Sequence, residues 1–457
     1  MPFVPHTEED IREMMAVCQI DKISQLFDEI PAHLRVTPLK EMDSGLNEMQ
    51  VSKLMHTRAS QDGIRLNFLG AGAYEHYIPS AVWDLVGRGE YLTSYTPYQA
   101  EASQGTLQLL WEFQTMIASL MGLDVANASL YDGATALTEA VLMLVRASKK
   151  SEGGQILVPN TLSPFYRDVL LALVGRQGIG LTEVPYQVKT GTIDLKALEA
   201  LTGDERRYEA VIIPQPNFFG VLEPVDAITD WAETKNIPVI GVVNPFAMTW
   251  LKPPGQWGKK GAVIACGEAQ PFGIPLSSGG PYCGFLACAS DYVRQMPGRL
   301  VGRTLDEKGR IGYTLTLQAR EQHIRRAKAT SNICTNQGLL VTAATIHMSI
   351  MGPEGLKRMA IASHQNLMLL KAKIHAAMGQ TGVRPMFSGQ HFHEMVFHLP
   401  KSAGPVLERL AKSGIDAGLQ LSPFYPELDN CILSCVTETK DEADLDAFCD
   451  TLKIALN

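Results

Sequence analysis

Short apolar runs alternate with longer amphipathic stretches between about residues 129 and 289. The apolar runs are Gln155–Pro159, Leu181–Tyr186, Glu209–Pro216, Ile237–Val243, Ala262–Gly267 and Cys283–Ala289. Helical patterns separate several of them, such as Ala134–Ala147 and Val225–Lys235. Strands that alternate with helices predict βαβ units, and nearly continuous apolar strands indicate a sheet covered on both faces. The sequence therefore predicts an α/β fold with a large, mostly parallel sheet.

The regions on either side of this alternation have other patterns. Residues 8–28 predict two short amphipathic helices that separate near Cys18–Asp21, and Asp43–Met55 predicts another helix. Arg303–Ile350 has a helical pattern, and the sequence MGPEG at Met351–Gly355 breaks it. The rest of the chain mixes helices with short strands. We expect three parts, namely an N-terminal helical segment 1–64, a large α/β domain 65–350 and a small C-terminal α+β domain 351–457.

Composition and charge limit the classes of function. The 457 residues are 46% apolar and 19% charged, as in a globular protein with more than one core. The formal net charge of -8 argues against a broad interaction with nucleic acid, which needs a basic surface. No run approaches the roughly 18 apolar residues of a membrane helix, and MPFVPHTEED lacks the features of a secretory signal. We expect a soluble cytoplasmic protein whose partners include neither nucleic acid nor a membrane.

The eight cysteines do not form a recognisable metal or disulfide pattern. No pair of CxxC motifs is present and the histidines complete no zinc pattern, so we expect no metal site. Cys431 and Cys435 could share one face of a helix, but the surrounding CILSCV alternates like a strand and would place both on one face of a sheet. Buried free thiols are the favoured interpretation, and they suit a reducing compartment.

Three predicted strand ends carry unusual residues, and open parallel sheets bind ligands at the carboxyl ends of their strands. Within Ala128–Ala140 a helix begins after Asp132. Its N-terminus is a ready anion site, although Asp132 as a simple helix cap is the favoured interpretation. The strand Ile237–Val243 ends at Asn244. The third end carries Gln270, ahead of a loop rich in Gly, Ser and Pro.

Longer motifs carry a more specific signal. They are SYTPYQAEASQGTLQ (Ser94–Gln108), GLDVANASLYDGATALTEA (Gly122–Ala140), LKPPGQWG (Leu251–Gly258), AQPFGIPLSSGGPYCGF (Ala269–Phe285), MPGRLVG (Met296–Gly302) and AREQHIRRAKATSNICTNQ (Ala319–Gln337). Through them nearly the whole chain closely resembles the glycine decarboxylase P-protein family of the glycine cleavage system (glycine dehydrogenase, decarboxylating). The match is to subunit 1 (alpha) of the split two-subunit form, equivalent to the amino-terminal half of the fused form. The resemblance implies the fold of pyridoxal-phosphate (PLP) dependent transferases of type I, which is aspartate aminotransferase-like.

The resemblance also implies which polypeptide holds the cofactor. In this family PLP is bound covalently by a lysine of the other half, and Gln270 stands at the lysine position here. Asn244 stands where related enzymes usually carry an Asp whose carboxylate keeps the pyridine nitrogen protonated. Lys252, Lys259 and Lys260 are not placed to substitute for the missing lysine. We therefore expect no Schiff-base lysine on this chain, and a partner, glycine decarboxylase subunit 2, in an α2β2 heterotetramer.

The family reaction implies a role at the partner's site. Glycine is decarboxylated on PLP, and its aminomethyl group passes to the lipoyl group of the H-protein, whose disulfide is reduced. Sites of this fold type form at dimer interfaces, and the best candidate for reaching across is Tyr95–Gly105, which is polar, aromatic and stiffened by Pro97. The candidate residues are Tyr95, Thr96, Tyr98, Gln99, Glu101, Ser103 and Gln104. Alternatively, the segment only joins the two subunits.

Two further clusters are weaker candidates. The sequence REQHIRR favours an interface ion-pair network over catalysis, and its charged side chains include Arg320, His323, Arg325 and Arg326. His391 and His393 alternate like strand residues and have no visible ligand partner, so no role is assigned to them. Two competing functions stay open. One is a catalytically silent scaffold that stabilises the partner or docks the H-protein, and the other is a standalone PLP-dependent aminotransferase.

Overall fold

The computed structural model describes residues 5–36, 45–63, 65–148, 154–203, 208–277 and 279–457. The chain divides into two compact units, Met1–Ile64 and Arg65–Asn457. The helices of the first unit are α1 (Glu8–Val17), η1 (Ile23–Phe27), η2 (Ala32–Leu34) and α2 (Glu48–Asp62).

The first unit largely follows its sequence pattern. The separation between α1 and η1 confirms the break expected near Cys18–Asp21. Helix α2 begins after Asn47, whose side chain accepts a hydrogen bond from the backbone N–H of Gln50 at 3.0 Å. This cap makes the helix start later than the predicted Asp43, which itself lies outside the described residues.

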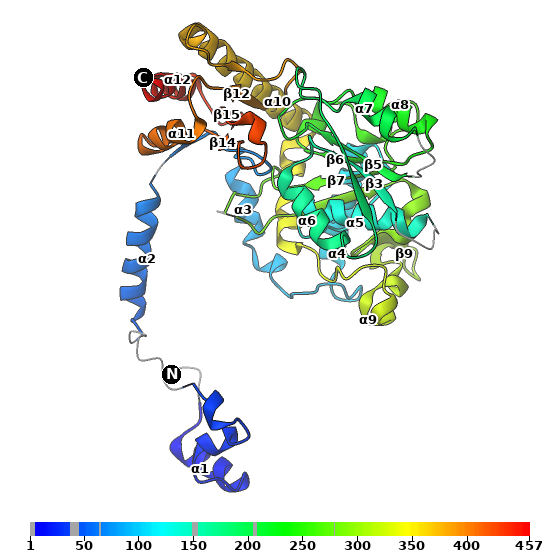
Figure 1. The fold of residues 1–457 in the computed structure, drawn as a ribbon. Helices are drawn as coiled ribbons and strands as arrows, with labels where there is room; N and C mark the ends of the chain where they lie inside the picture. The colour runs from blue at the N-terminus through cyan, green and yellow to red at the C-terminus, as the bar shows by residue number, and fades with distance from the viewer. Residues whose placement is uncertain (1–4, 37–44, 64, 149–153, 204–207, 278) are drawn as a thin grey trace. The chain divides into compact units, whose positions relative to one another are not determined.

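A seven-stranded sheet forms the centre of the second unit (Figure 1), in the order β2-β8-β7-β6-β5-β3-β4. Strands β7, β6, β5, β3 and β4 are parallel, and β8 is antiparallel to both of its neighbours. All six predicted strands are confirmed to within two residues at every end, and so is the α/β class. The strands are β2 (Val125–Ala126), β3 (Gln155–Pro159), β4 (Gly180–Val184), β5 (Tyr208–Gln215), β6 (Val239–Val243), β7 (Ile264–Glu268) and β8 (Gly284–Cys288).

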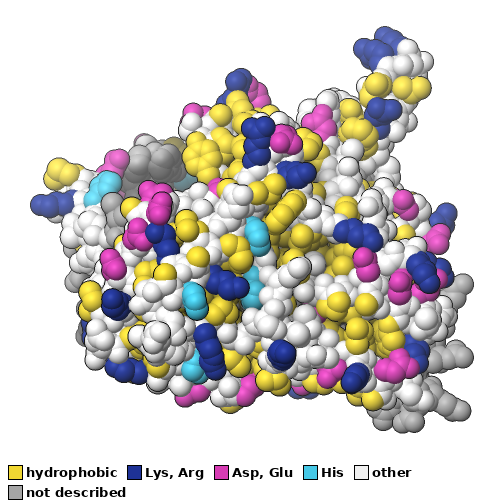
Figure 2. Space-filling model, turned by 90° about the horizontal axis from the view of Figure 1, so that it is seen from above, with side chains coloured by type: hydrophobic (Ala, Val, Ile, Leu, Met, Phe, Trp, Pro, Cys, Tyr) yellow, Lys and Arg dark blue, Asp and Glu magenta, His cyan; other side chains and the backbone are white. Residues whose placement is uncertain are grey.

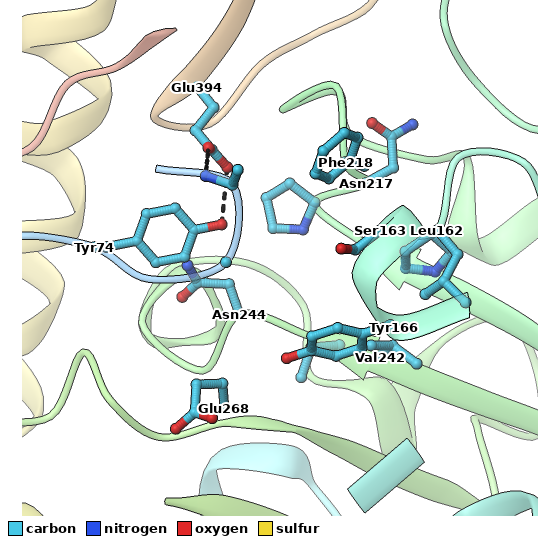
Figure 3. A pocket seen from close by; sticks show the side chains of 15 residues that line it. Tyr74, Leu162, Ser163, Tyr166, Asn217, Phe218, Val242, Asn244, Glu268 and Glu394 are labelled. Atoms are coloured by element: carbon cyan, nitrogen blue, oxygen red, sulfur yellow. Dashed lines mark hydrogen bonds between the residues drawn. The ribbon is translucent and has the colours of Figure 1, made fainter. Parts of the chain in front are cut away.

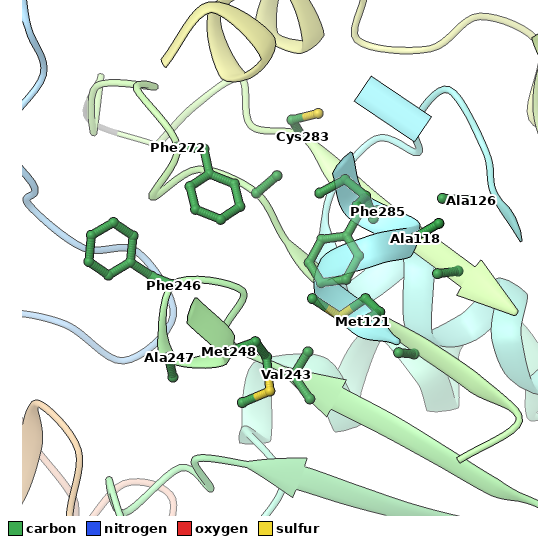
Figure 4. Packing of buried hydrophobic residues seen from close by; sticks show 14 of the residues in the cluster. Ala118, Met121, Ala126, Val243, Phe246, Ala247, Met248, Phe272, Cys283 and Phe285 are labelled. Atoms are coloured by element: carbon green, nitrogen blue, oxygen red, sulfur yellow. The ribbon is translucent and has the colours of Figure 1, made fainter. Parts of the chain in front are cut away.

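Both faces of the large sheet are buried, because alternate residues of each strand enter two different cores. In β5, Val211 and Ile213 belong to one core, whereas Ala210 and Ile212 belong to the other. Figure 4 shows members of the first core from α4, β6 and β8. The second core includes apolar residues of α5 and α6. Burial on both sides explains why these strands read as continuous apolar runs.

Helices and short turns surround this sheet, and the predicted helices at Ala134–Ala147 and Val225–Lys235 are confirmed as α5 and α8. The helices are α3 (Ser80–Val86), α4 (Gln104–Met121), α5 (Gly133–Ala147), α6 (Pro164–Val174), α7 (Leu195–Leu201) and α8 (Val225–Thr234). The short turns are 3-10 helices, namely η3 (Gly89–Tyr91), η4 (Ala247–Thr249), η5 (Pro254–Gln256) and η6 (Ser290–Gln295).

The prediction of helix throughout Arg303–Ile350 is wrong in its first half. A hairpin of β9 (Val301–Leu305) and β10 (Ile311–Leu315) occupies this region. Asp306 closes the turn, since its carboxylate accepts from the backbone N–H groups of Lys308 and Arg310. The short elements η7 (Gln318–Arg320), α9 (Gln322–Arg325) and η8 (Arg326–Lys328) follow the hairpin.

The long helix α10 (Gly338–Met378) is interrupted where MGPEG predicts a break. Gly352 has φ +61° and ψ 174°, which is a non-helical conformation that favours glycine, and Pro353 follows it. The remaining helices are α11 (Ala403–Lys412), η9 (Pro426–Leu428) and α12 (Glu442–Leu456).

A second, antiparallel sheet lies in the C-terminal part, in the order β11-β12-β15-β14. Its strands are β11 (Arg384–Pro385), β12 (Glu394–His398), β14 (Leu419–Gln420) and β15 (Cys431–Cys435). Strand β1 (Leu66–Asn67) pairs in parallel with β13 (Ile415–Asp416). Phe68 belongs to the same apolar cluster as Phe397 and Phe448. The segment after residue 65 is therefore packed with the C-terminal part of the chain.

All eight cysteines are free. The strand interpretation of Cys431–Cys435 is confirmed, and both thiols are buried. The expectation of burial fails for Cys18 and Cys334, which are exposed because Cys18 ends the surface helix α1 and Cys334 lies in a loop.

Charges of both signs are scattered over the face in Figure 2, without a broad basic patch. None of the helices in the described ranges combines the length and apolar character that crossing a membrane requires. Over the same residues, no group of three or more His, Cys, Asp and Glu side chains is arranged to hold a metal ion.

Trp257 offers a test of the core beside β6. Its side chain is fully buried, and its indole N–H donates to the carbonyl of Lys252 at 2.9 Å. We expect W257A to lower the free energy of unfolding by about 3–5 kcal/mol, and W257F by less, because Phe fills most of the space but leaves that carbonyl unpaired. Urea denaturation of the full chain measures both. The half-exposed Trp250 is the control, and a loss in W250A as large as in W257A would contradict the assignment.

Candidate functional site

A small cavity lies at the carboxyl ends of the parallel strands (Figure 3), where a ligand of such a sheet is expected. Strands β5, β6 and β7 contribute their last residues or the residues that follow them, α6 contributes its start, and the loop after β1 and the start of β12 complete the wall. The lining residues are Ala71, Gly72, Tyr74, Leu162, Ser163, Tyr166, Pro214, Pro216, Asn217, Phe218, Val242, Val243, Asn244, Glu268 and Glu394.

Gln270 lies beside this cavity, and its side-chain amide is fully engaged. The oxygen Oε1 accepts from the backbone N–H of Tyr74 at 2.8 Å. The nitrogen Nε2 donates to the carbonyls of Tyr74 at 2.9 Å and of Ile274 at 2.8 Å. Gln270 therefore holds the loop that carries Tyr74. A lysine could donate, but it could not accept the bond from Tyr74.

Asn244 is likewise bonded within the chain. Its Oδ1 accepts from the backbone N–H groups of Phe246 at 2.8 Å and Ala247 at 3.2 Å, and its Nδ2 lies 3.3 Å from Nε2 of His393. The amide thus stabilises the turn after β6. Burial lowers the pKa of His393 well below its ordinary value, so this neighbour is uncharged near neutral pH.

Glu268 was not identified from the sequence, yet it is the most tightly bonded carboxylate of this edge. Oε2 accepts from the N–H of Gly133 at 3.0 Å, and Oε1 accepts from the N–H groups of Gln270 at 3.0 Å and Cys283 at 2.8 Å. Burial raises its pKa to about 7, while the three donors act in the opposite direction. Asp132 caps α5 separately, accepting from Thr135 N–H at 2.8 Å, which confirms the favoured interpretation of that residue.

A second buried carboxylate, Glu394, holds the loop after β1 from the other side. It accepts from the N–H of Ala71 at 2.6 Å and from the hydroxyl of Tyr74 at 2.8 Å. Burial raises its pKa to about 7. The sequence signal for both residues is a glutamate at a terminus of a mostly apolar strand, the last residue of β7 and the first of β12, and the sequence interpretation did not use it.

A wider groove brings together the two clusters that the sequence singled out separately. One wall comes from the segment 93–103 and the other from the region around β10 and α9. The lining residues are Thr93, Ser94, Thr96, Tyr98, Gln99, Ala102, Ser103, Arg299, Leu315, Gln318, Glu321, His323 and Cys334. This groove offers hydroxyl, amide, guanidinium, imidazole and thiol groups to a ligand or a neighbouring protein.

Tyr98 is held in one orientation within the groove by contacts of both its hydroxyl and its ring. Its hydroxyl donates to Oδ1 of Asn336 at 2.6 Å, and the guanidinium carbon of Arg299 lies 4.9 Å from the centre of its ring. Arg299 forms an ion pair with Glu321, and Nδ1 of His323 lies 3.4 Å from the same carboxylate. Partial burial raises the pKa of Tyr98, so the hydroxyl stays protonated at neutral pH.

The seven candidates from the segment 95–104 therefore separate into two groups. Those that line the groove are Thr96, Tyr98, Gln99 and Ser103. Tyr95 is 86% exposed, and Glu101 is exposed and outside the lining. Gln104 is bonded to the hairpin instead, since its Oε1 accepts from Tyr313 N–H at 2.9 Å and its Nε2 donates to Tyr313 O at 2.8 Å.

The remaining candidates lie elsewhere. Arg320 and Arg325 line a neighbouring basic hollow with Arg146, whereas Arg326 does not. His391 forms an isolated bridge with Val221 and is buried.

Comparison with known proteins identifies the family. The family model described as glycine cleavage system P-protein matches residues 1–452. The chain belongs to this family. A relative from Thioalkalivibrio sulfidiphilus, named probable glycine dehydrogenase (decarboxylating) subunit 1, is 58% identical over 456 residues and covers 100% of both chains. The corresponding relative from Nitrosomonas europaea is 56% identical and covers 100% of this chain and 99% of its own.

Solved structures confirm the expected fold. A crystal structure of glycine decarboxylase (P-protein) of the glycine cleavage system, in inhibitor-bound form, matches with a TM-score of 0.87 at 39% identity over 100% of both chains. More distant neighbours, such as a sphingosine-1-phosphate lyase from Burkholderia pseudomallei (TM-score 0.66, 15% identity, 93% and 92% coverage), share the type I fold of PLP-dependent enzymes. The chain is thus a glycine cleavage protein and a subunit of a split enzyme, as the resemblance implied.

The fold family implies PLP, but this chain's own sheet edge does not fit the cofactor. Among the described residues that line the small cavity there is no lysine. Gln270 and Asn244 use their amides on backbone groups. Glu268 already occupies the N-terminus of α5. No chemical step is therefore assigned to this cavity.

The burial of Glu394 predicts a pH dependence of stability. Its pKa is about 7 in the folded protein against an ordinary value of 4.5, so its contribution to stability is full below about pH 4.5 and is lost as the pH rises through about 7. In E394Q this titration is absent. We expect the difference in free energy of unfolding, wild type minus E394Q, to decrease between about pH 5 and 8 in urea denaturation. A difference that stays constant over this interval would show that Glu394 is ionised throughout.

Proposed function

We propose that this chain is the subunit without a cofactor lysine in a two-subunit glycine dehydrogenase (decarboxylating). The observation that carries the proposal is the filled sheet edge, where Gln270 is bonded to both backbone groups of Tyr74. The lysine-bearing subunit 2 holds PLP covalently, and the two chains form an α2β2 heterotetramer in the cytoplasm. The complex decarboxylates glycine and transfers the aminomethyl group to the lipoyl group of the H-protein. The names of the relatives, each a subunit 1, support this assignment.

The groove is the part of this chain that we assign to the partner's site. PLP, when bound in the partner's site, supplies an electron sink for the loss of carbon dioxide. Tyr98 and Ser103 present hydroxyl groups, and Gln99 presents an amide, for orienting glycine or the lipoyl arm. The Tyr98 hydroxyl donates its hydrogen to Asn336, which fixes the direction of the oxygen lone pairs, and an oriented acceptor contributes more than a mobile one.

Exposed apolar side chains beside the groove support the proposal that a second polypeptide binds there. Leu92 is 60% exposed and Tyr95 is 86% exposed, each next to lining residues in the sequence. On the other wall Ile324 is 52% exposed beside His323. Apolar and aromatic groups that surround a polar site are typical of a subunit interface. Contact with the partner also excludes water from the groove.

Substitution of Tyr98 tests the contribution of the groove. Y98F keeps the ring beneath Arg299 but removes the hydroxyl that donates to Asn336. In the complex with subunit 2 we expect the rate of glycine–carbon dioxide exchange to fall about tenfold, as for the loss of one oriented hydrogen bond. S103A should show a smaller fall. The control is Y292F, whose tyrosine lies in η6 outside the groove.

The second candidate, a scaffold that only stabilises its partner, predicts another outcome. Every groove variant, including T96A and Q99A, would then keep full exchange while the complex stays intact by size-exclusion chromatography. An intact, fully active complex for all four variants would replace our proposal with the scaffold.

A standalone aminotransferase is tested on the full chain without its partner. After incubation with PLP, removal of the free compound and borohydride reduction, we expect no stoichiometric adduct on any one lysine by mass spectrometry, because the described lining of the small cavity contains no lysine. The matched control is the same treatment of subunit 2. A fixed adduct on a lysine of this chain would reverse the assignment of the cofactor.

A further inference from the structure

Glu268 places a carboxyl group at the N-terminus of α5, where its three backbone donors favour the ionised form. Free backbone N–H groups and the helix dipole favour an anion at such a position. All three hydrogen-bond partners of Glu268, the N–H groups of Gly133, Gln270 and Cys283, are donors. A carboxylate, which only accepts, matches them. The side chain is 7% exposed, so this charge is an internal part of the fold.

We propose that Glu268 is a built-in anion that takes the place of a cofactor phosphate at this chain's own sheet edge. The absence of a lysine prevents only the covalent bond to PLP, and a helix N-terminus could still hold the phosphate group. With Glu268 in place the N–H of Gly133 is already bonded. A phosphate would also stand beside a buried carboxylate in surroundings of low dielectric constant, where like charges repel strongly.

The surroundings of Glu268 supply no positive charge to a second anion. No lysine or arginine belongs to the described lining of the cavity, so nothing offsets the added charge. The hydroxyl of Tyr166 closes the space beside Gly133, where even a Cβ atom would collide with it. The cavity itself measures about 80 Å³, which is room for a few water molecules. Figure 3 shows Glu268 and Tyr166 facing this space.

Two independent features therefore close this edge to PLP: Gln270 at the lysine position and Glu268 at the anion position. The second feature explains how the start of α5 is bonded without a ligand, since Glu268 joins α5, β7 and the start of β8 through its three bonds. It goes beyond the proposed function, which concerns the groove and the partner's site.

The first test is rescue of a truncated variant by added anions. E268A in the full chain removes the carboxylate and leaves three unpaired N–H groups around a vacated space. We expect E268A to melt at a lower temperature than wild type. Inorganic phosphate or formate should raise its Tm by about 3 °C or more at an ionic strength held constant with sodium chloride. Wild type should not respond.

The matched control is E268Q, which fills the same space without a charge. Its Tm should not respond to phosphate, because occupancy rather than charge alone blocks the site. Stabilisation of E268Q equal to that of E268A would overturn the proposal, as would an E268A variant that phosphate and formate affect no more than chloride.

A second measurement on wild type does not depend on the folding of any variant. Hydrogen–deuterium exchange of peptides that contain Gly133, Gln270 and Cys283 reports on the three N–H groups directly. We expect their exchange to be unchanged by inorganic phosphate or PLP. Slower exchange of these peptides in wild type with either compound would show that the edge accepts a phosphate, and the proposal would fail. This result is separate from glycine–carbon dioxide exchange in the complex, on which the role of the groove depends.

Discussion

The carboxyl edge of a parallel sheet collects unpaired backbone groups from strands that are far apart in the sequence, and those groups need polar partners. In this chain the partners are its own side chains. Gln270 accepts a hydrogen bond from the backbone N–H of Tyr74, and Asn244 accepts one from the turn after β6. Glu268 accepts one from the N–H of Gly133 at the start of α5. Because the groups at the lysine position, the pyridine-partner position and the start of α5 are already bonded within the chain, these three positions offer no vacant group to a cofactor. Polar side chains that line an open space lie instead in the groove beside the β9–β10 hairpin.

Buried carboxylates stabilise this arrangement through their bonds to backbone and side-chain donors. Burial raises the pKa values of Glu223, Glu268 and Glu394 to about 7, which indicates a cost of ionisation in each case. Each carboxylate accepts from N–H groups of distant segments, such as Ile193 for Glu223 and Ala71 for Glu394. The glutamates therefore fix the positions of loops relative to one another. Removing one would leave several donors unpaired at once.

The sequence predicted the large sheet well because its central strands, such as β5, β6 and β7, are buried on both faces and are therefore mostly apolar. The hairpin of β9 and β10 was missed because its strands carry exposed polar residues such as Arg303 and Thr304. The role of Glu268 depends on a contact with Gly133, 135 positions away, and no local pattern encodes such a contact. The sequence predicted polar candidate residues in one segment of the groove, but it did not predict the directions of their side chains. Gln104 faces the hairpin, whereas Tyr98 faces Asn336.

The orientation of Gln104 has a consequence for the groove as a whole. Its amide joins the start of α4 to Tyr313 in β10, so the two walls are held together by bonds that do not use the lining residues. Tyr98 and Ser103 are thereby fixed in position while their hydroxyl groups remain near the surface of the groove. A chain that provides a rigid, polar and partly exposed wall, but closes its own ligand edge, is suited to complete a site on another polypeptide. This division underlies our proposal that a partner subunit supplies the cofactor lysine.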